Sequence, residues 1–140
     1  MKKIKILTIS SSGFNINDGI GTVLYDYYSR FDLNQFEVHL VVAGKYNCEI
    51  IKKFENIGVI PQFLPSRNKE VFKYFYDLIQ LIKCKKYDIM YANGSSALLS
   101  VDLFAAKISG CKCRVVHSHN TKCDHKGLDW LLRPALYALY

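Results

Sequence analysis

Short β-branched runs alternate with amphipathic helical patterns along this chain, and that alternation limits its fold more than any other feature of the sequence. Apolar runs typical of buried strands cover residues 6–9, 36–42, 59–64, 87–92 and 113–118. Helical spacing covers residues 20–31, 46–57, 69–84, 97–109 and 127–140. Strands joined by helices form βαβ units with right-handed crossovers. We therefore expect an α/β fold, a doubly wound, Rossmann-like parallel sheet with the strand order 3-2-1-4-5.

Single residues predict how these elements end and pack. Gly58 stands where a helix commonly ends in a glycine. Pro61 indicates that the third strand lies at a sheet edge or that Pro61 lies at a strand end, because proline cannot donate to a ladder. The polar turn 93–96 is expected to supply the N-cap of helix 97–109. The longest helix has a predicted apolar face that excludes Tyr74 and Leu81. That face consists of Val71, Phe72, Phe75, Leu78, Ile79 and Ile82.

The first strand is followed by a polar, glycine-containing loop and then by a helix. Glycines such as Gly19 and Gly21 let a backbone approach a ligand closely, and free N–H groups at a helix start favour an anion. The alternative is that both glycines only permit a tight turn and close packing. The spacing does not match the dinucleotide-binding fingerprint, because no third glycine follows at the required distance.

Three polar turns are expected to meet at one edge of the sheet. In doubly wound sheets, ligands bind beyond the carboxyl ends of the strands, where the winding reverses. With the expected strand order, that point lies between the first and fourth strands. The turns 11–21, 93–96 and 117–121 would gather there.

The charge and cysteine content narrow the class of partner and the compartment. The chain has 140 residues and a net charge of +7, which suits a nucleic acid, an anionic membrane or a phosphorylated substrate. The lysines are scattered and no nucleic-acid module is recognisable, so we expect no nucleic acid. The five cysteines are irregularly spaced, and the sequence shows neither a secretory signal nor a membrane-spanning run. We therefore expect reduced thiols and a cytoplasmic protein.

A cluster of possible metal ligands near the end of the chain offers a rival interpretation. It consists of Cys111, Cys113, His117, His119, Cys123 and His125. This spacing matches none of the usual paired zinc patterns, and a strand would hold Cys113 and His117 too far apart. We expect no metal, and a Cys/His zinc-binding domain stays as an alternative.

The segment 69–86 combines basic and aromatic residues. Its cations are Lys69, Lys73, Lys83, Lys85 and Lys86, close in sequence to Tyr74, Tyr76 and Leu81. Such a segment can attach to anionic lipid. The alternative is a solvated helix face with an ordinary apolar stripe on its other side.

Two regions of the chain resemble a known enzyme family. The strand, the Ser-Ser-Gly loop and Gly19-Ile20-Gly21 resemble the start of family-4 retaining glycosyltransferases with the GT-B fold. The run 114–121 resembles the fifth-strand motif of the capsule and exopolysaccharide members, and the run 87–94 fits their fourth strand. The resemblance covers residues 1–140 but only the amino-terminal, acceptor-side domain of a two-domain enzyme. The apolar run 135–140 has no helix stop signal, so we expect a chain that stops inside a longer protein and is inactive alone.

The resemblance implies a role for single residues. Gly19 and Gly21 match loop glycines that lie against the donor diphosphate, and His119 matches a histidine that faces the reacting sugar. Asn120 stands where many relatives have an aspartate. We interpret His117 as a structural residue. The expected acceptor side of the site is lined by Ser11, Asn17, Asn93, Ser95, Asn120 and Thr121.

The implied reaction moves a sugar from a nucleotide-sugar to a saccharide or lipid-linked saccharide acceptor. It requires no cofactor and no obligatory metal, since preorganised N–H groups stabilise the leaving diphosphate. An anionic membrane surface, on the inner face of the plasma membrane, is a further candidate partner. A self-contained α/β binding domain stays as an alternative of a different class, although Ser10, Ser11 and Ser12 replace the acidic cluster of a receiver domain.

Overall fold

The computed structural model describes residues 2–11, 13–15, 18–94 and 98–118. The strands are β1 (Ile4–Ser10), β2 (Phe36–Ala43), β3 (Ile60–Leu64), β4 (Ile89–Asn93) and β5 (Cys113–His117). The helices are α1 (Gly19–Tyr28), α2 (Cys48–Asn56), α3 (Val71–Lys85) and α4 (Leu99–Ile108). The strand ends differ from the sequence-based expectation by two residues at most. The predicted helix 127–140 lies outside the described residues.

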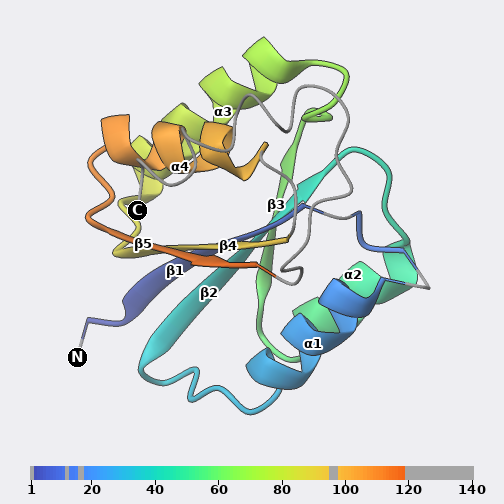
Figure 1. The fold of residues 1–140 in the computed structure, drawn as a ribbon. Coiled ribbons are helices and arrows are strands. Elements are labelled where there is room, and N and C mark those ends of the chain that lie inside the picture. Colours follow the sequence, from blue (N-terminus) through green and yellow to red (C-terminus); the bar gives the residue numbers. More distant parts are fainter. Residues whose placement is uncertain (1, 12, 16–17, 95–97, 119–140) are drawn as a thin grey trace.

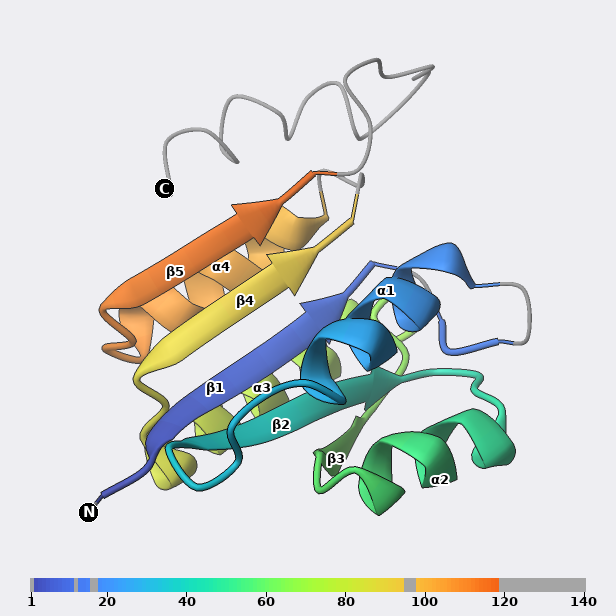
Figure 2. The same ribbon diagram turned by 90° about the horizontal axis from the view of Figure 1, so that it is seen from below.

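All five strands are parallel and form one sheet in the order β3-β2-β1-β4-β5, which confirms the expected doubly wound, Rossmann-like topology. Helices α1 and α2 lie on one face of the sheet, and α3 and α4 lie on the other (Figures 1 and 2). Each face has its own apolar core, centred on Leu24 and Phe54 on the first face and on Leu78 and Met90 on the second. The winding therefore reverses between β1 and β4.

Several local predictions are confirmed. Strand β3 is an edge strand, as Pro61 indicated. Gly58 follows the end of α2 with a φ of +86°, the left-handed conformation expected of a glycine after a helix. In the part of the chain that the structure describes, no helix is long and apolar enough to cross a membrane.

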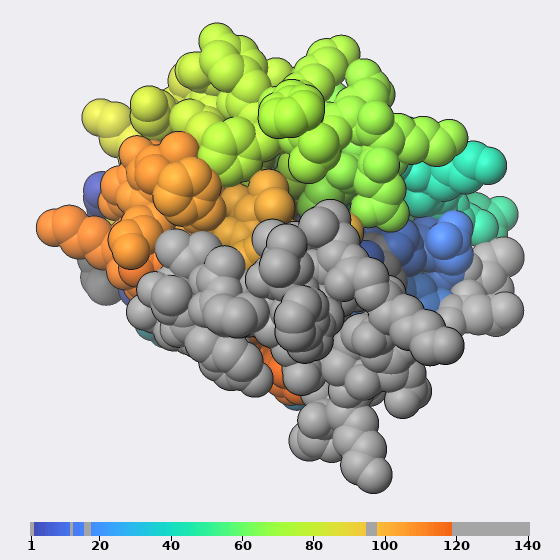
Figure 3. Space-filling model, turned by 45° about the horizontal axis from the view of Figure 1, so that its top comes forward, coloured from blue at the N-terminus to red at the C-terminus, as the bar shows by residue number. Residues whose placement is uncertain are grey.

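The predicted apolar face of α3 is confirmed for Leu78 and Ile82, which are buried, and for Phe75 and Ile79, which pack against the core. It is wrong at Val71, Phe72 and Tyr74. Tyr74 is fully buried together with Leu78 and Ile82, whereas Phe72 is 88% exposed. Tyr74 turns inward because its hydroxyl has a buried partner, the carboxylate of Asp102 on α4. The side chains of α3 and α4 share one surface of the molecule, seen in green and orange in Figure 3.

Two further expectations about helix ends are corrected. The N-cap residue of helix α4 is Leu98, which makes no side-chain cap hydrogen bond, and not a residue of the turn 93–96. Residues 95 and 96 of that turn lie outside the described residues. Helix α1 ends at Tyr28, and Tyr27 and Phe31, which the periodicity placed on its apolar face, are exposed. Phe31 instead packs against Tyr28 and the first residue of β2.

Candidate functional site

The carboxyl ends of three strands meet at one edge of the sheet. Ser10, Asn93 and His117 are register partners across β1, β4 and β5. Beyond them, the Ser11 amide donates to the Asn93 carbonyl over 2.7 Å, and the Gly94 amide donates to the His117 carbonyl over 3.0 Å. These bonds continue the parallel ladder past the strands, and the carboxyl ends of β1, β4 and β5 lie at one rim, as expected (Figure 2).

The three register partners point toward the same face of the sheet, the one that carries α1, because register neighbours share a face. Tyr91 lies on the same face, two residues before Asn93 on β4. Its hydroxyl and His117 Nδ1 form a 3.0 Å hydrogen bond, and the two rings stack. The Thr8 hydroxyl bonds to the Tyr28 hydroxyl of α1. Polar side chains from three strands and one helix therefore line this part of the rim. The Tyr91 bond fits the structural role expected for His117.

Asn93 stands out within this row. Its side chain is almost fully buried, with 1% of the residue exposed, and neither amide atom forms a hydrogen bond of normal geometry with a described residue. Its one polar contact among the described side chains is a weak interaction with Tyr91, which opposes the rise that burial causes in the pKa of that hydroxyl. A buried amide without partners costs free energy that a bound hydroxyl or carbonyl could recover. The position of Asn93 at the switch point between β1 and β4 is where a doubly wound sheet holds its ligand.

Gly94 allows the ends of β1 and β4 to approach each other. Its φ is +145°, and an added Cβ would lie 1.7 Å from Ser11 Oγ and 2.3 Å from Ser11 Cβ. No other residue type fits without displacing Ser11. Sequence reasoning missed this requirement, because a glycine in a polar turn shows nothing of the strand that lies beside it.

The start of α1 presents the two predicted glycines in different ways. Asp18 caps the helix, and its carboxylate accepts the Ile20 amide over 3.1 Å. A Cβ on Gly21 would lie 3.0 Å from Asp18 Oδ2 and 3.5 Å from Phe14, so close packing explains this glycine. A Cβ on Gly19 would meet nothing within 4 Å. Gly19 is also exposed whereas Gly21 is buried, so Gly19 is the glycine whose backbone is accessible to a ligand. Its N–H lies in the first turn, which has no intrahelical acceptor.

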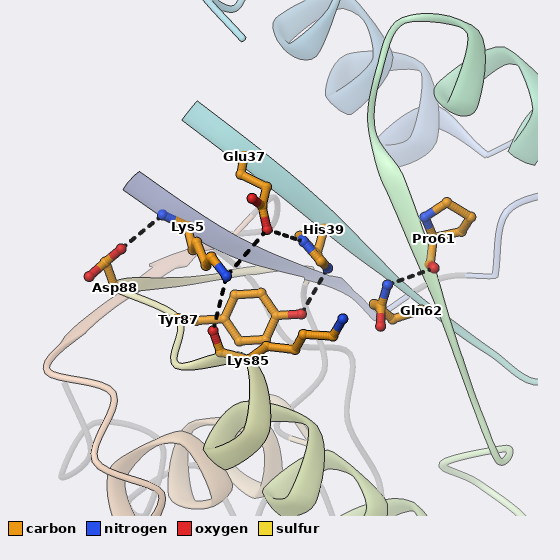
Figure 4. A network of polar contacts seen from close by, with 8 residues as sticks. All are labelled: Lys5, Glu37, His39, Pro61, Gln62, Lys85, Tyr87 and Asp88. Atoms are coloured by element: carbon orange, nitrogen blue, oxygen red, sulfur yellow. Dashed lines mark hydrogen bonds and ion pairs between the residues drawn. The ribbon is translucent and has the colours of Figure 1, made fainter. Parts of the chain in front are cut away.

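A second histidine network lies away from this rim. His39 on β2 is buried, its Nε2 donates to Glu37 over 2.8 Å, and its Nδ1 accepts from the Tyr87 hydroxyl over 2.9 Å. Lys5 also contacts Glu37 (Figure 4). Burial lowers the pKa of His39, only partly opposed by Glu37, which favours the neutral ring. The network joins β1, β2 and the segment before β4, and its role is structural.

The remaining predicted site residues cannot be placed. His119, Asn17, Ser95, Asn120 and Thr121 lie outside the described residues. Ser11, Asn93, Gly19 and Gly21 are described, and Ser11 and Asn93 meet directly at the rim.

Only three of the six possible zinc ligands, Cys111, Cys113 and His117, lie among the described residues. Within residues 2–11, 13–15, 18–94 and 98–118, no group of three His, Cys, Asp or Glu side chains could hold a metal ion. Cys113 and His117 stand four residues apart on one strand, a separation of about 13 Å. Cys111 is buried, and burial raises the pKa of its thiol. His119, Cys123 and His125 lie outside the described residues.

Comparison with known proteins finds similarity in structure alone. No protein-family model and no curated protein sequence matches the chain. Its structure is similar to the crystal structure of HepE from Anabaena in complex with UDP, with a TM-score of 0.65 and 18% identity. It is also similar to a UDP-N-acetylglucosamine 2-epimerase, with a TM-score of 0.58 and 14% identity. The matches cover 97% and 99% of this chain but only 35% and 39% of those proteins. The similarity therefore shows the fold.

Proposed function

We propose that this chain is the amino-terminal, acceptor-side part of a GT-B glycosyltransferase of the family-4 type. The enzyme would transfer a sugar from a nucleotide-sugar to a saccharide acceptor in capsule or exopolysaccharide synthesis. The observation that carries the proposal is the meeting of the turns after β1, β4 and β5 at one rim, through the Ser11–Asn93 and Gly94–His117 backbone bonds. Two further findings support it: the fold is shared with a protein solved with UDP, and the buried amide of Asn93 forms no hydrogen bond of normal geometry with a described residue.

Each residue of the rim has its own proposed role in the transfer. The open backbone of Gly19 at the start of α1 binds the donor diphosphate and stabilises the charge that develops on it as the sugar leaves. Gly21 keeps the turn compact by packing on Asp18 and Phe14. Asn93 offers both a donor and an acceptor to a sugar hydroxyl, and Ser11 lies beside it. The proposed site is completed by Asn17, Ser95, Asn120 and Thr121.

His119 is the proposed catalytic residue. In the sequence it follows the last residue of β5 by two positions, and β5 ends at the rim that Asn93 and Gly94 occupy. A histidine there can exchange a hydrogen bond with the reacting sugar as the transition state forms. No cofactor takes part, and no metal is obligatory.

The direct test uses the complete gene product that contains residues 1–140. Its acceptor-dependent release of UDP from UDP-sugars is compared between the wild type and His119→Ala. We expect release in the wild type and a loss of at least about a hundredfold in the variant, the usual contribution of an acid–base group. Circular dichroism shows whether the variant is folded. Near-normal turnover in a folded variant would refute the role of His119, and no release of any nucleoside diphosphate would refute the transferase proposal.

We also propose that the acceptor is lipid-linked and that the enzyme works on an anionic membrane surface. Helix α3 exposes Phe72 and Tyr76, at 88% and 62%, beside the exposed Lys73. On the neighbouring α4, Phe104 is 46% exposed and stacks against Phe75. Exposed aromatic rings next to cations favour binding to an anionic interface. Tyr74, which the sequence also suggested for this surface, is buried and takes no part.

The alternative, a self-contained α/β binding domain, makes a different prediction. Such a domain would bind its ligand fully as residues 1–140 and would not gain a transferase activity from any further sequence. Comparing UDP affinity of residues 1–140 with that of the complete gene product separates the two, because a GT-B enzyme forms its donor site between two domains.

A further inference from the structure

A small cavity with one cationic side chain lies beside the rim, on the opposite face of the sheet from α1. It has a volume of about 80 Å³ and lies beyond the carboxyl ends of β1 and β2, next to the loop between β3 and α3. Its polar lining comes from Ser10, Ser11, Ser66, Arg67 and Asn68. Because a water molecule takes about 30 Å³ of liquid, the cavity can hold a group of a few heavy atoms.

Arg67 is held in place by a buried network. Its Nη1 donates to Asp102 Oδ2 over 2.5 Å, and the Tyr74 hydroxyl donates to Asp102 Oδ1 over 2.7 Å. Its Nη2 lies 3.4 Å from the Ser11 carbonyl oxygen, at the end of β1. The side chain of Arg67 is only 8% exposed, and that of Asp102 is fully buried. The guanidinium is therefore fixed between α4 and the loop that follows β1.

The orientation of this ion pair gives the cavity a positive wall. Among the described residues, Arg67 is the only charged one that lines the cavity, whereas Asp102 lies behind it and does not reach the lining. A guanidinium has five N–H donors, and its contacts with Asp102 and Ser11 use two of them. The remaining donors have no hydrogen-bond partner among the described residues and can serve a group in the cavity. The hydroxyl of Ser66 and the amide of Asn68 can donate to the same group.

We propose that this cavity binds an oxyanion, a phosphate or a carboxylate, carried by the acceptor. This inference rests on the proposed transferase function and adds the chemical class of its acceptor. A planar guanidinium with free donors matches the geometry of an oxyanion, and the Arg67–Asp102 ion pair presents its positive end to the cavity. Ser11 belongs to both the cavity lining and the rim, since its amide bonds to Asn93. An acceptor held by its oxyanion at Arg67 therefore reaches the switch point with its remaining part.

Binding can be measured without any transferase activity. The probe is inorganic phosphate, titrated into ¹⁵N-labelled residues 1–140 at constant ionic strength held with chloride, and glucuronate serves as the carboxylate probe. We expect saturable shifts of the Arg67 Nε–H signal and of the Ser66 and Asn68 amide signals. A stronger response to phosphate indicates a phosphate-bearing acceptor, and a stronger response to glucuronate indicates a uronic-acid acceptor. No saturable shift with either probe would overturn the proposal.

Variants separate this cavity from general attraction to a basic protein. Arg67→Lys keeps the charge beside Asp102 but loses the fork of donors, and we expect at least tenfold weaker binding. Ser66→Ala and Asn68→Ala leave the ion pair intact and should each weaken binding about threefold, which keeps the test valid if Arg67→Lys does not fold. Lys83→Ala, near the end of α3, and Ser29→Ala, after α1, are the controls and should bind phosphate as the wild type does.

The outcomes distinguish this proposal from the function on which it rests. Equal weakening by Lys83→Ala, or unchanged binding in both Ser66→Ala and Asn68→Ala, would overturn the cavity as an oxyanion site. If the cavity does not bind phosphate but the complete enzyme still releases UDP, only the proposed class of acceptor is refuted. If the cavity binds phosphate specifically but the complete enzyme transfers no sugar, the oxyanion site is supported and the transferase proposal is refuted.

Discussion

The Ser11 side chain lies so close to Gly94 that only a glycine fits at position 94: a Cβ there would lie 1.7 Å from Ser11 Oγ. The two residues end neighbouring strands, and the Ser11 amide bonds to the carbonyl of the residue before Gly94. This close approach brings the loop after β1 onto the loop after β4. The proposed site depends on it, because the backbones of Asn93 and Ser11 are bonded across the same junction.

The first prediction concerns that approach. Gly94→Ala should lower the free energy of unfolding by about 2–4 kcal/mol, since it adds both a clash and a strained φ. Ser11→Gly removes the two atoms that collide, so the double variant should recover part of the loss. Urea denaturation of the four proteins gives the coupling energy. Strictly additive effects would show that the two residues do not touch in solution.

The second prediction separates the two glycines of α1. Gly21→Ala should destabilise the chain by about 1 kcal/mol, because its methyl group would press on Asp18. Gly19→Ala should leave stability unchanged or raise it by up to about 0.5 kcal/mol, because alanine is the better helix former and meets no atom. In the complete enzyme, Gly19→Ala should nevertheless weaken donor binding about tenfold. Calorimetric titration with UDP measures this, with the exposed Asp26→Asn on α1 as the control; unaltered affinity would mean that the diphosphate does not lie against Gly19.

The third prediction concerns Tyr74. Tyr74→Phe keeps the ring but deletes the donor to Asp102, so the buried carboxylate loses a hydrogen bond and stability should fall by about 1–3 kcal/mol. Burial already raises the pKa of Asp102, opposed by Arg67 and by this hydroxyl, so the loss should raise that pKa further. Tyr76→Phe, on the exposed side of the same helix, is the matched control and should change stability by less than about 0.5 kcal/mol. Equal effects in the two variants would contradict the network.

The fourth prediction tests the membrane surface. Replacing Phe72 and Tyr76 with serine should reduce co-sedimentation with anionic liposomes about tenfold, because two exposed aromatic rings no longer enter the interface. Phe63→Ser removes an exposed ring from the edge strand β3 and should have no effect. Wild-type binding should weaken as salt is added. Binding that depends on neither salt nor anionic lipid would exclude this surface as a membrane site.

The sequence predicted the sheet and the rim because both follow from periodicity. Alternating strands and helices have few topologies, and strand order then decides which turns meet. The site details that escaped prediction depend on contacts between distant residues. Arg67 stands in a short loop without a pattern, 35 residues before its partner Asp102. Tyr74 was assigned to the wrong face because hydrophobic spacing cannot register a hydroxyl with a buried acceptor. The requirement for Gly94 appears only once β1 lies beside β4.

The fifth prediction concerns pH and the histidine network of β2. Burial lowers the pKa of His39 below its usual 6.5, so the unfolded chain binds this proton more readily than the folded chain. The contribution to stability is therefore complete above pH 6.5 and is lost as the pH falls below that value. Glu37 accepts a hydrogen bond from His39, and its own pKa is lowered mainly by that bond, so Glu37 stays ionised in this range. The nearby Lys5 and Lys85 oppose a positive charge on the His39 ring. Between pH 7.5 and 5.5, unfolding free energy should fall with a slope of at most about 1.4 kcal/mol per pH unit.

His39→Gln removes the titrating group while keeping a side chain that can bond to Glu37 and Tyr87. It should be less stable than the wild type at pH 7.5, because the ring also packs against Tyr87, but its stability should vary less between pH 7.5 and 5.5. Urea denaturation at several pH values gives both curves. The same slope in the variant would assign the pH dependence to other groups and would mean that His39 takes up a proton as easily in the folded chain as in the unfolded one.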